Sequence, residues 1–233
     1  MSLAKRMTTR LKRFAKIMLG RELYLRTEKK VPTEKHGGEY GGWVICPSHV
    51  TEESIVYSLG VGTDVSFDLS IIEKYGMNVY AFDPTPQSIE WVNSQNLPQE
   101  FKFYEYGVAD YNGMATFYPP NNPDYVSHTI LARPTNKERA IVVPVRTLQS
   151  VMRELGHKKI DILKMNIEGA EYAIIEDMIK DQINVIQLLL EFHHRFADIP
   201  LEQTKKSIRL LNQHGYKIFH ISDRGKEYSF IRS

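Results

Sequence analysis

Residues 55–64 read Ile-Val-Tyr-Ser-Leu-Gly-Val-Gly-Thr-Asp, and this stretch decides the fold class. Its first five residues form a short apolar run, as expected of a buried strand. Gly60-Val61-Gly62 follows at once, and apolar residues then recur at helical spacing. A glycine turn between a strand and a helix lets a ligand approach the backbone, and the helix N-terminus attracts a carboxylate. The stretch therefore predicts the first strand and the ligand loop of a nucleoside-binding α/β sheet.

Outward from this stretch, short apolar strands alternate with helical segments, which is the pattern of a parallel sheet. We expect strands at 55–59, 78–82, 102–106, 115–118, 141–145, 160–166, 185–191, 217–222 and 228–231, and helices at 64–74, 87–94, 148–155, 169–179 and 201–214. The last two strands form an antiparallel hairpin of the kind that a methyltransferase sheet adds to a nucleotide-binding sheet. The predicted fold is α/β: a doubly wound, mostly parallel, seven-stranded Rossmann-like methyltransferase sheet with a C-terminal antiparallel hairpin.

The composition fits one domain with an extension. A chain of 233 residues with 42% hydrophobic residues can bury one substantial core. The single cysteine, Cys46, excludes a disulfide framework, and no grouped Cys and His ligands indicate a metal site. No apolar run approaches the ~20 residues needed to cross a bilayer. We expect a cytoplasmic protein in which residues 1–52 form an extension and residues 53–233 the catalytic domain.

Charge is unevenly distributed along the chain. Residues 1–35 contain eleven Lys and Arg against three Glu, and because the whole chain carries +2, the remainder carries −6. An acidic body argues against a nucleic-acid enzyme, whose main domain would usually be basic. No nucleic-acid partner is therefore expected.

The basic extension begins with an amphipathic pattern. Its apolar residues recur at helical spacing, with Lys and Arg between them: Leu3, Met7, Leu11, Phe14 and Met18. We favour a helix that packs this stripe on the domain; the alternative is a peripheral contact of residues 1–20 with a membrane surface or an acidic partner. Residues 27–54 are dense in Gly and Pro and predict a loop-rich connection without regular elements.

An acid stands where the second predicted strand ends. Asp83 lies 23 residues after Gly60 and is followed by Pro84. An ionised carboxylate at this strand tip offers only acceptors, so it can take both ribose hydroxyls of an adenosine. The alternative is an ordinary acid that initiates the next helix.

The third predicted strand leads into Gly107-Val108-Ala109-Asp110. An adenine ring would lie here, with Asp110 as the acceptor of its amino group and Val108 or Ala109 offering backbone groups. Turn residues before the next hairpin explain the same pattern equally well.

Residues 161–171, Asp-Ile-Leu-Lys-Met-Asn-Ile-Glu-Gly-Ala-Glu, are the most unusual stretch. A buried parallel strand normally contains only apolar residues, so Lys164 and Asn166 need local partners or cost several kcal/mol. We expect Asn166 to face the reacting group, Lys164 to pair with Glu168 or Glu191, and Glu168 to orient a substrate.

Histidines supply the candidate bases. His193 and His194 follow the strand at 185–191, and a histidine that titrates near neutrality can accept a hydroxyl proton. A partly exposed loop histidine is the alternative for both. His128 is a weaker candidate, and Trp43 and Tyr40 could close over the site, although core packing is more common for Trp43.

In this order, these segments resemble the FkbM family of methyltransferases. The resemblance covers Ile55 to about Ile231 and rests mainly on residues 163–171. It implies S-adenosylmethionine as cofactor and O-methylation of a hydroxyl group on a small-molecule or glycan acceptor, a sugar or a natural product. The family usually has Asp in place of Asn166 and Glu in place of Asp83.

Two other functions are open at this point. A nucleotide-dependent oxidoreductase would need a small residue where Val65 stands, and the terminal hairpin also argues against it. A methyltransferase-like fold that binds cofactor or glycan without catalysis is the second, because Asn166 lacks a carboxylate. The pattern does not specify an oligomeric state.

Overall fold

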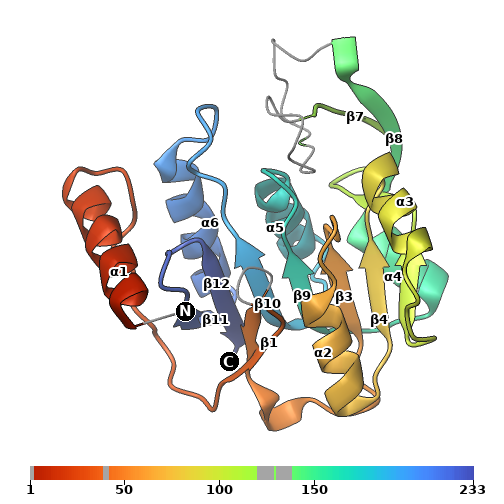
Figure 1. Ribbon diagram of the computed structural model, residues 1–233, viewed down its shortest axis with the longest axis horizontal. Helices are drawn as coiled ribbons and strands as arrows, with labels where there is room; N and C mark the ends of the chain where they lie inside the picture. Colours follow the sequence, from red (N-terminus) through yellow and green to blue (C-terminus); the bar gives the residue numbers. More distant parts are fainter. Residues whose placement is uncertain (1–2, 39–41, 120–128, 130–137) are drawn as a thin grey trace.

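A computed structural model describes residues 3–38, 42–119, 129 and 138–233, with side chains from residue 7 onward. A seven-stranded sheet lies at its centre, in the order β11-β12-β10-β9-β3-β4-β5 (Figure 1). Its strands are β3 (Val56–Leu59), β4 (Val79–Phe82), β5 (Phe101–Tyr104), β9 (Ile160–Met165), β10 (Val185–Glu191), β11 (Tyr216–Ile221) and β12 (Glu227–Arg232).

The order of the strands reverses at the centre of the sheet. β3 pairs in parallel with both β4 and β9, so the chain builds outward in one direction and then crosses back to build in the other. β12 enters antiparallel between β10 and β11. The predicted seven-stranded, mostly parallel sheet with its terminal hairpin is confirmed, and the reversal is where open α/β sheets bind ligands.

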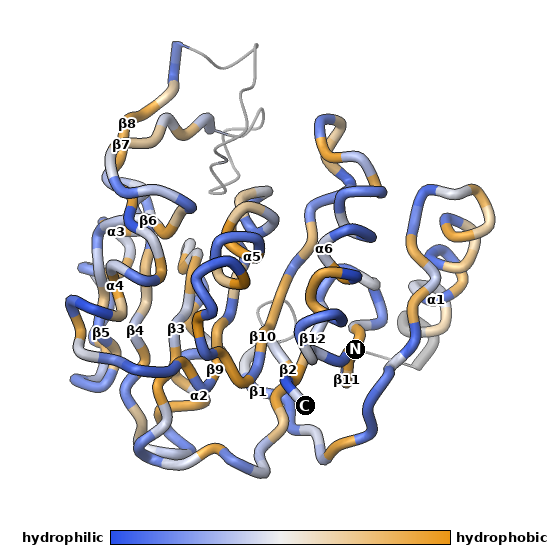
Figure 2. Tube along the Cα trace, turned by 180° about the vertical axis from the view of Figure 1, so that it is seen from behind, coloured by the Kyte–Doolittle hydropathy of each residue, from blue (hydrophilic) through white to orange (hydrophobic). Residues whose placement is uncertain are grey.

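Helices cover both faces of the sheet. One face packs against α4 (Leu148–Leu155), α5 (Glu171–Lys180) and α6 (Leu201–Gln213), and the other against α2 (Ser66–Tyr75) and α3 (Pro86–Ser94). The alternation along β9 shows why: Leu163 and Met165 face the first layer, whereas Ile162 faces the second. Figure 2 shows these central strands as largely hydrophobic.

The connection before the sheet contains regular structure that the glycine and proline content did not predict. β1 (Glu34–His36) and β2 (Trp43–Ile45) form an antiparallel pair, followed by the short helix η1 (Pro47–His49). Trp43 is buried against the α2 face, as core packing requires. Gln187 of β10 accepts a hydrogen bond from the Cys46 amide (2.7 Å) and donates one to the Cys46 carbonyl (2.9 Å), which fixes the segment to the sheet.

A second small sheet stands beyond β5. β6 (Gly107–Val108), β8 (Ile141–Arg146) and β7 (Gly113–Phe117) form it in this order, with β8 parallel to β6 and antiparallel to β7. Its strands β7 and β8 project as an arm above the carboxyl ends of the central strands (Figure 1).

The N-terminal extension forms the predicted helix, α1 (Leu3–Met18), at the β11–β12 edge of the molecule (Figure 1). The expectation that its apolar stripe packs on the domain is wrong. Met7, Leu11, Phe14 and Met18 are 58–72% exposed. Polar contacts hold the helix instead, because Arg10 bonds Asp223 in the β11–β12 turn (2.8 Å).

The chain after α1 runs along the edge strand. The amides of Glu28 and Lys29 both donate to the Ile218 carbonyl of β11, and the Glu28 carboxylate accepts from the Ile218 amide (2.8 Å). These contacts cover backbone groups that an open sheet edge would expose. Among the described residues, none of the helices is both long enough and apolar enough to span a membrane.

Candidate functional site

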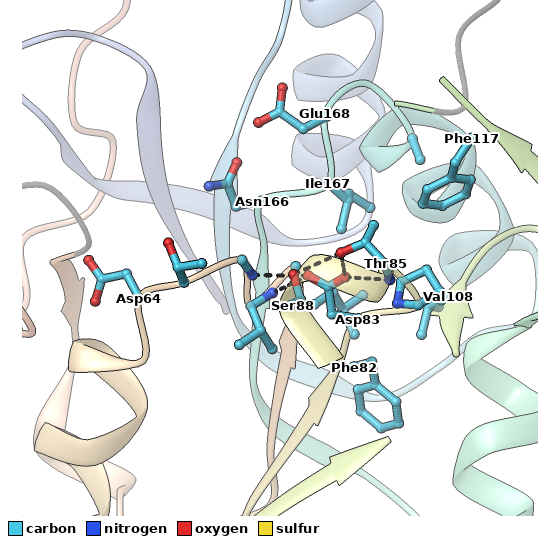
Figure 3. Close-up of a pocket in the computed structure, with 18 residues that line it drawn as sticks. Asp64, Phe82, Asp83, Thr85, Ser88, Val108, Phe117, Asn166, Ile167 and Glu168 are labelled. Atoms are coloured by element: carbon cyan, nitrogen blue, oxygen red, sulfur yellow. Dashed lines mark hydrogen bonds between the residues drawn. The ribbon is translucent and has the colours of Figure 1, made fainter. Parts of the chain in front are cut away.

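A pocket opens at the carboxyl ends of the central strands, where the strand order reverses (Figure 3). The glycine turn after β3, the end of β4, β6 and the turn after β9 line it, and Phe117 of the arm closes one side. Of the residues expected at the site, the pocket brings together Gly60, Val61, Gly62, Asp83, Pro84, Val108, Asn166 and Glu168.

Gly60 lies where the glycine turn after β3 packs against the end of β9. Its φ of 80° lies in the left-handed region, and a Cβ there would be 1.9 Å from the Asn166 carbonyl oxygen. The Asn166 amide also donates to the Leu59 carbonyl (3.0 Å). Only glycine therefore lets the glycine turn and the end of β9 form one continuous wall.

The Asp83 carboxylate fixes the glycine turn through hydrogen bonds. One carboxylate oxygen accepts the amides of Val61 and Gly62 (both 3.0 Å), and the other accepts the amide (3.0 Å) and hydroxyl (2.7 Å) of Thr85. A carboxylate has about four acceptor positions, so Asp83 uses them all on the chain itself (Figure 3). The expectation that it binds ribose hydroxyls stays a prediction, and the structure adds a role that the sequence did not indicate.

Lys164 contacts the glycine turn from the α2 side of the sheet and does not line the pocket. Its Nζ donates to the Gly60 carbonyl (2.6 Å), and Asp68 of α2 is the acid that most favours its charge. Burial lowers the pKa of Lys164, and burial likewise raises the pKa of Asp68. The expected pairing with Glu168 or Glu191 is wrong, because residue 164 faces the α2 side of the sheet, whereas Glu191 bonds Lys226 (3.0 Å).

Asn166 lines the pocket and contains an unsatisfied hydrogen-bond acceptor. Its Oδ1 is buried and has no hydrogen-bond partner among the described residues, while the residue lines the cavity. Because a buried polar atom without a partner is costly, this oxygen fits a hydrogen-bond donor on a ligand.

Glu168 stands at the pocket wall in an unusual backbone conformation. Its φ of 52° is in the left-handed region, where residues other than glycine are uncommon. The hydroxyl of Thr129 donates to its carbonyl and so supports the turn. Burial raises the pKa of the Glu168 carboxyl above its ordinary value of 4.5, although the nearby His193 opposes this.

His193 reaches the pocket only through Glu168. Its Nε2 is 3.7 Å from the Glu168 carboxylate, and its Nδ1 and backbone amide both meet Oε1 of Glu171 (3.1 and 2.9 Å). Burial alone would lower the pKa of His193, but Glu171, Glu168 and Glu191 outweigh it and raise the pKa above 6.5. Glu171 is fully buried, and its position in the sequence did not predict this role.

His194 is a structural residue in this arrangement. Its Nε2 meets Glu22 (3.0 Å) and its Nδ1 meets the hydroxyl of Thr204 (3.3 Å), so both ring nitrogens have partners away from the pocket. Arg195 also bonds Glu22. The expectation of His194 as a base is wrong because successive side chains after β10 point in different directions.

Asp110 is a further correction. It is exposed and does not line the pocket. The strand β6 ends at Val108, and the Ala109 amide continues its pairing with β8 by donating to the Arg146 carbonyl (2.9 Å), so the chain has left the pocket before Asp110. Val108 itself does line the pocket. Tyr40 and His128 lie outside the described residues.

The pocket has an acidic character. Asp64, Asp83 and Glu168 line it, and no Lys or Arg does so in the part of the chain that the structure describes. Nor do the described residues hold three or more His, Cys, Asp or Glu side chains placed to bind a metal ion. Such a pocket suits a cationic ligand, whereas the pyrophosphate of a dinucleotide would meet repulsion.

Three comparisons place these features among known proteins. Residues 46–218 match the model of the family described as the methyltransferase FkbM domain. The probable methyltransferase-like protein 24 of Homo sapiens is 26% identical over 189 residues, covering 76% of this chain and 45% of the human protein. The chain therefore spans less than half the length of this curated relative.

Two solved structures align with lower similarity. The FkbM methyltransferase from Methylobacillus flagellatus KT aligns with a TM-score of 0.48 at 11% identity, covering 78% of this chain and 44% of that chain. Aeropyrum pernix fibrillarin, solved with natively bound S-adenosyl-L-methionine, aligns with a TM-score of 0.42 at 9% identity, covering 78% of this chain and 67% of that chain.

Proposed function

Since the chain belongs to the methyltransferase FkbM domain family, we propose that it uses S-adenosylmethionine to methylate a hydroxyl group of a sugar, glycan or natural product. The observation that carries the choice of cofactor is the acidic pocket. Asp64, Asp83 and Glu168 line it without a cationic side chain among the described lining residues. A sulfonium cofactor is favoured by this field, and a dinucleotide is not.

The pocket residues fit the parts of this cofactor. The orphaned Oδ1 of Asn166 is an acceptor for the ammonium group of a methionine moiety. The glycine turn and the start of α2 would receive its carboxylate, and Val108 and Pro84 offer an apolar surface to an adenine ring.

Glu168 is the residue that we assign as general base. When bound, the cofactor supplies an electrophilic methyl group, which passes to the hydroxyl oxygen as the sulfur–carbon bond breaks. Glu168 lines the pocket and would accept the hydroxyl proton, for which its raised pKa suits it better than an ordinary carboxylate. Alignment of the acceptor in the pocket would supply most of the acceleration.

His193 and Glu171 are positioning residues in this scheme. Glu171 holds Nδ1 of His193, which turns Nε2 toward Glu168. The carboxylate of Glu168 is thereby held at the pocket wall, in the way that a third group orients the base in other catalytic arrays.

Calorimetry with S-adenosylmethionine and with NAD tests the proposal. We expect S-adenosylmethionine to bind, and Asp83→Ala to weaken binding at least about tenfold because the glycine turn loses its clamp, a loss of about 1.4 kcal/mol. Asp110→Ala is the matched control: it removes an exposed carboxylate outside the pocket, so affinity should stay within about twofold.

Two results would contradict this reading. Tighter binding of NAD than of S-adenosylmethionine would remove the cofactor assignment. Binding without formation of S-adenosylhomocysteine from any of a panel of hydroxylated acceptors, alongside turnover of amines, would remove the assignment of O-methylation.

A further inference from the structure

The exposed apolar side chains of the molecule are concentrated in its N-terminal extension. Among the described residues, nine large apolar side chains are exposed, and six of them belong to residues 7–24. These six are Met7, Leu11, Phe14, Met18, Leu19 and Tyr24. Isolated exposed apolar residues are normal on a protein surface, but a cluster of this kind marks an interaction site.

Four of the six form one continuous stripe on α1. Met7, Leu11, Phe14 and Met18 are spaced four, three and four residues apart, which places them on one side of the helix. The residues turned toward the domain are Thr9, Arg13 and Ile17, which are partly buried. The helix therefore presents its apolar side to solvent and its contact side to the protein, the reverse of an ordinary surface helix.

The charge of the helix is entirely positive. Residues 3–18 contain six Lys and Arg and no acid. Of these, Arg10 bonds Asp223, whereas neither Lys12 nor Lys16 forms an ion pair with a described acidic side chain. By helical spacing Lys12 and Lys16 lie on the side of α1 away from the stripe. A basic polar side opposite an apolar side is typical of a helix that lies in a membrane surface, where its positive charge is attracted to anionic lipids while the stripe enters the acyl boundary.

The helix is fixed to the catalytic domain rather than loosely attached. Arg13 packs directly over Gly225, so its guanidinium occupies the space of a Cβ there. Shortly after the helix, the buried Glu22 bonds both His194 and Arg195, and Glu28 and Lys29 then bond Ile218 of the edge strand β11. A surface bound by α1 would thus hold the whole domain in one orientation.

From these observations we propose that α1 binds the surface of an anionic lipid bilayer through its Met7–Met18 stripe, with the positive charges of Lys12 and Lys16 adding electrostatic attraction to the lipid phosphates. Charge complementarity selects this occupant. A nucleic acid would engage the lysines but leave the stripe exposed, and a second copy would bring like-charged helices together.

Sedimentation with lipid vesicles tests the proposal on the full chain. Phosphatidylcholine vesicles containing about one third phosphatidylserine should pellet the protein, and pure phosphatidylcholine vesicles should do so at least about fivefold less, because the anionic surface attracts basic segments. Raising the salt concentration should weaken the binding, since it screens this attraction.

Two double variants separate the helix from general surface effects. Leu11→Glu with Phe14→Glu should reduce vesicle affinity at least about tenfold. Met114→Glu with Val142→Glu introduces the same charges at exposed apolar positions of the arm and should leave affinity within about twofold. All these side chains are exposed, so the melting temperature and cofactor binding should stay at wild-type values.

Lys12→Gln with Lys16→Gln completes the set. It should remove most of the preference for anionic vesicles while keeping the stripe. Absence of wild-type pelleting, or equal pelleting of wild type and the Leu11/Phe14 variant, would overturn the proposal. So would a dimer in analytical ultracentrifugation that this variant dissociates while vesicles stay unbound, since the occupant would then be a second copy.

Discussion

On the β3–β4 side of the pocket, the Asp83 carboxylate accepts four hydrogen bonds from the chain, whereas on the β9 side Asn166 Oδ1 accepts none from the described residues. The β9 side also contains Glu168, with a positive φ and a raised pKa. Satisfied groups rigidify a site, while unsatisfied or strained groups store energy that a ligand can release. The β3–β4 side, with Asp83, is therefore a preformed binding wall, and the β9 side, with Asn166 and the proposed base Glu168, is the reacting wall.

Gly60→Ala should have the largest effect on stability and on cofactor binding, because Gly60 lies where the two walls meet. The new Cβ would collide with the Asn166 carbonyl, and a backbone atom cannot move aside cheaply. We expect a loss of at least about 3 kcal/mol of unfolding free energy, measured by urea denaturation, together with loss of cofactor binding.

Gly156→Ala is the matched control for that prediction. Gly156 also has a positive φ (74°), but nothing lies within 4 Å of a Cβ there. It should cost only about 1 kcal/mol, the strain of the backbone conformation alone. Equal losses in both variants would mean that the close approach of the two walls has no energetic importance.

Glu168→Gln tests the reacting wall. It should lower turnover about a hundredfold, which corresponds to an activation free energy higher by about 2.7 kcal/mol. Cofactor affinity should stay near the wild-type value. A base must be ionised, and the pKa of Glu168 is raised above 4.5, so wild-type turnover should fall as pH drops through that raised value. The variant should lack this acidic limb. An unchanged limb in Glu168→Gln would assign the base to another residue.

Glu168→Gly separates reaction from strain at the same position. Glycine adopts a φ of 52° without penalty, so this variant should gain up to about 1 kcal/mol of stability while losing turnover. Wild-type turnover in the glycine variant would exclude the carboxylate from the chemistry.

Glu22→Gln tests the contacts of Glu22 with His194 and Arg195, the two residues that follow His193. Burial alone would raise the pKa of Glu22, but its bond to His194 and the charge of Arg195 lower it. A carboxyl with a lowered pKa adds stability above its ordinary pKa of 4.5 and loses it as pH falls through the folded-state value. We expect the variant to cost about 2–3 kcal/mol at pH 7 and progressively less below pH 4.5 in urea denaturation.

A pH-independent loss in Glu22→Gln would show that packing, not charge, holds this contact. Glu176→Gln offers a comparison, since the same change falls on an exposed carboxylate that bonds Lys206. That surface pair should contribute less than about 1 kcal/mol.

The central sheet could be predicted from the sequence because its strands are apolar runs between glycine and proline signals. β10 (Val185–Glu191) and α4 (Leu148–Leu155) were predicted with the bounds that they have in the structure. β1 and β6 were not predicted, since strands of two or three residues carry no periodicity. Tertiary pairing alone makes these segments regular.

The site was less predictable because side-chain partners depend on register. The sequence placed Asn166 and Glu168 at the correct strand end, but it could not show that His193 meets Glu168 while His194 meets Glu22. Nor does spacing reveal that Phe117 closes the pocket from a separate sheet. For α1, the amphipathic pattern correctly predicted a helix, but such a pattern does not determine which side of the helix packs against the protein.

The hydrogen bonds between Glu28 and Ile218 can form only late in the synthesis of the chain. A ribosome completes residues 22–28 long before residues 216–232, so the extension has no β11 to join until the last strands emerge. During that interval Glu22 lacks Arg195 and His194, and the basic helix is free of Asp223. The extension thus docks only after the last strands have formed, although it is translated before them, and a nascent chain would present its cationic helix before the pocket exists.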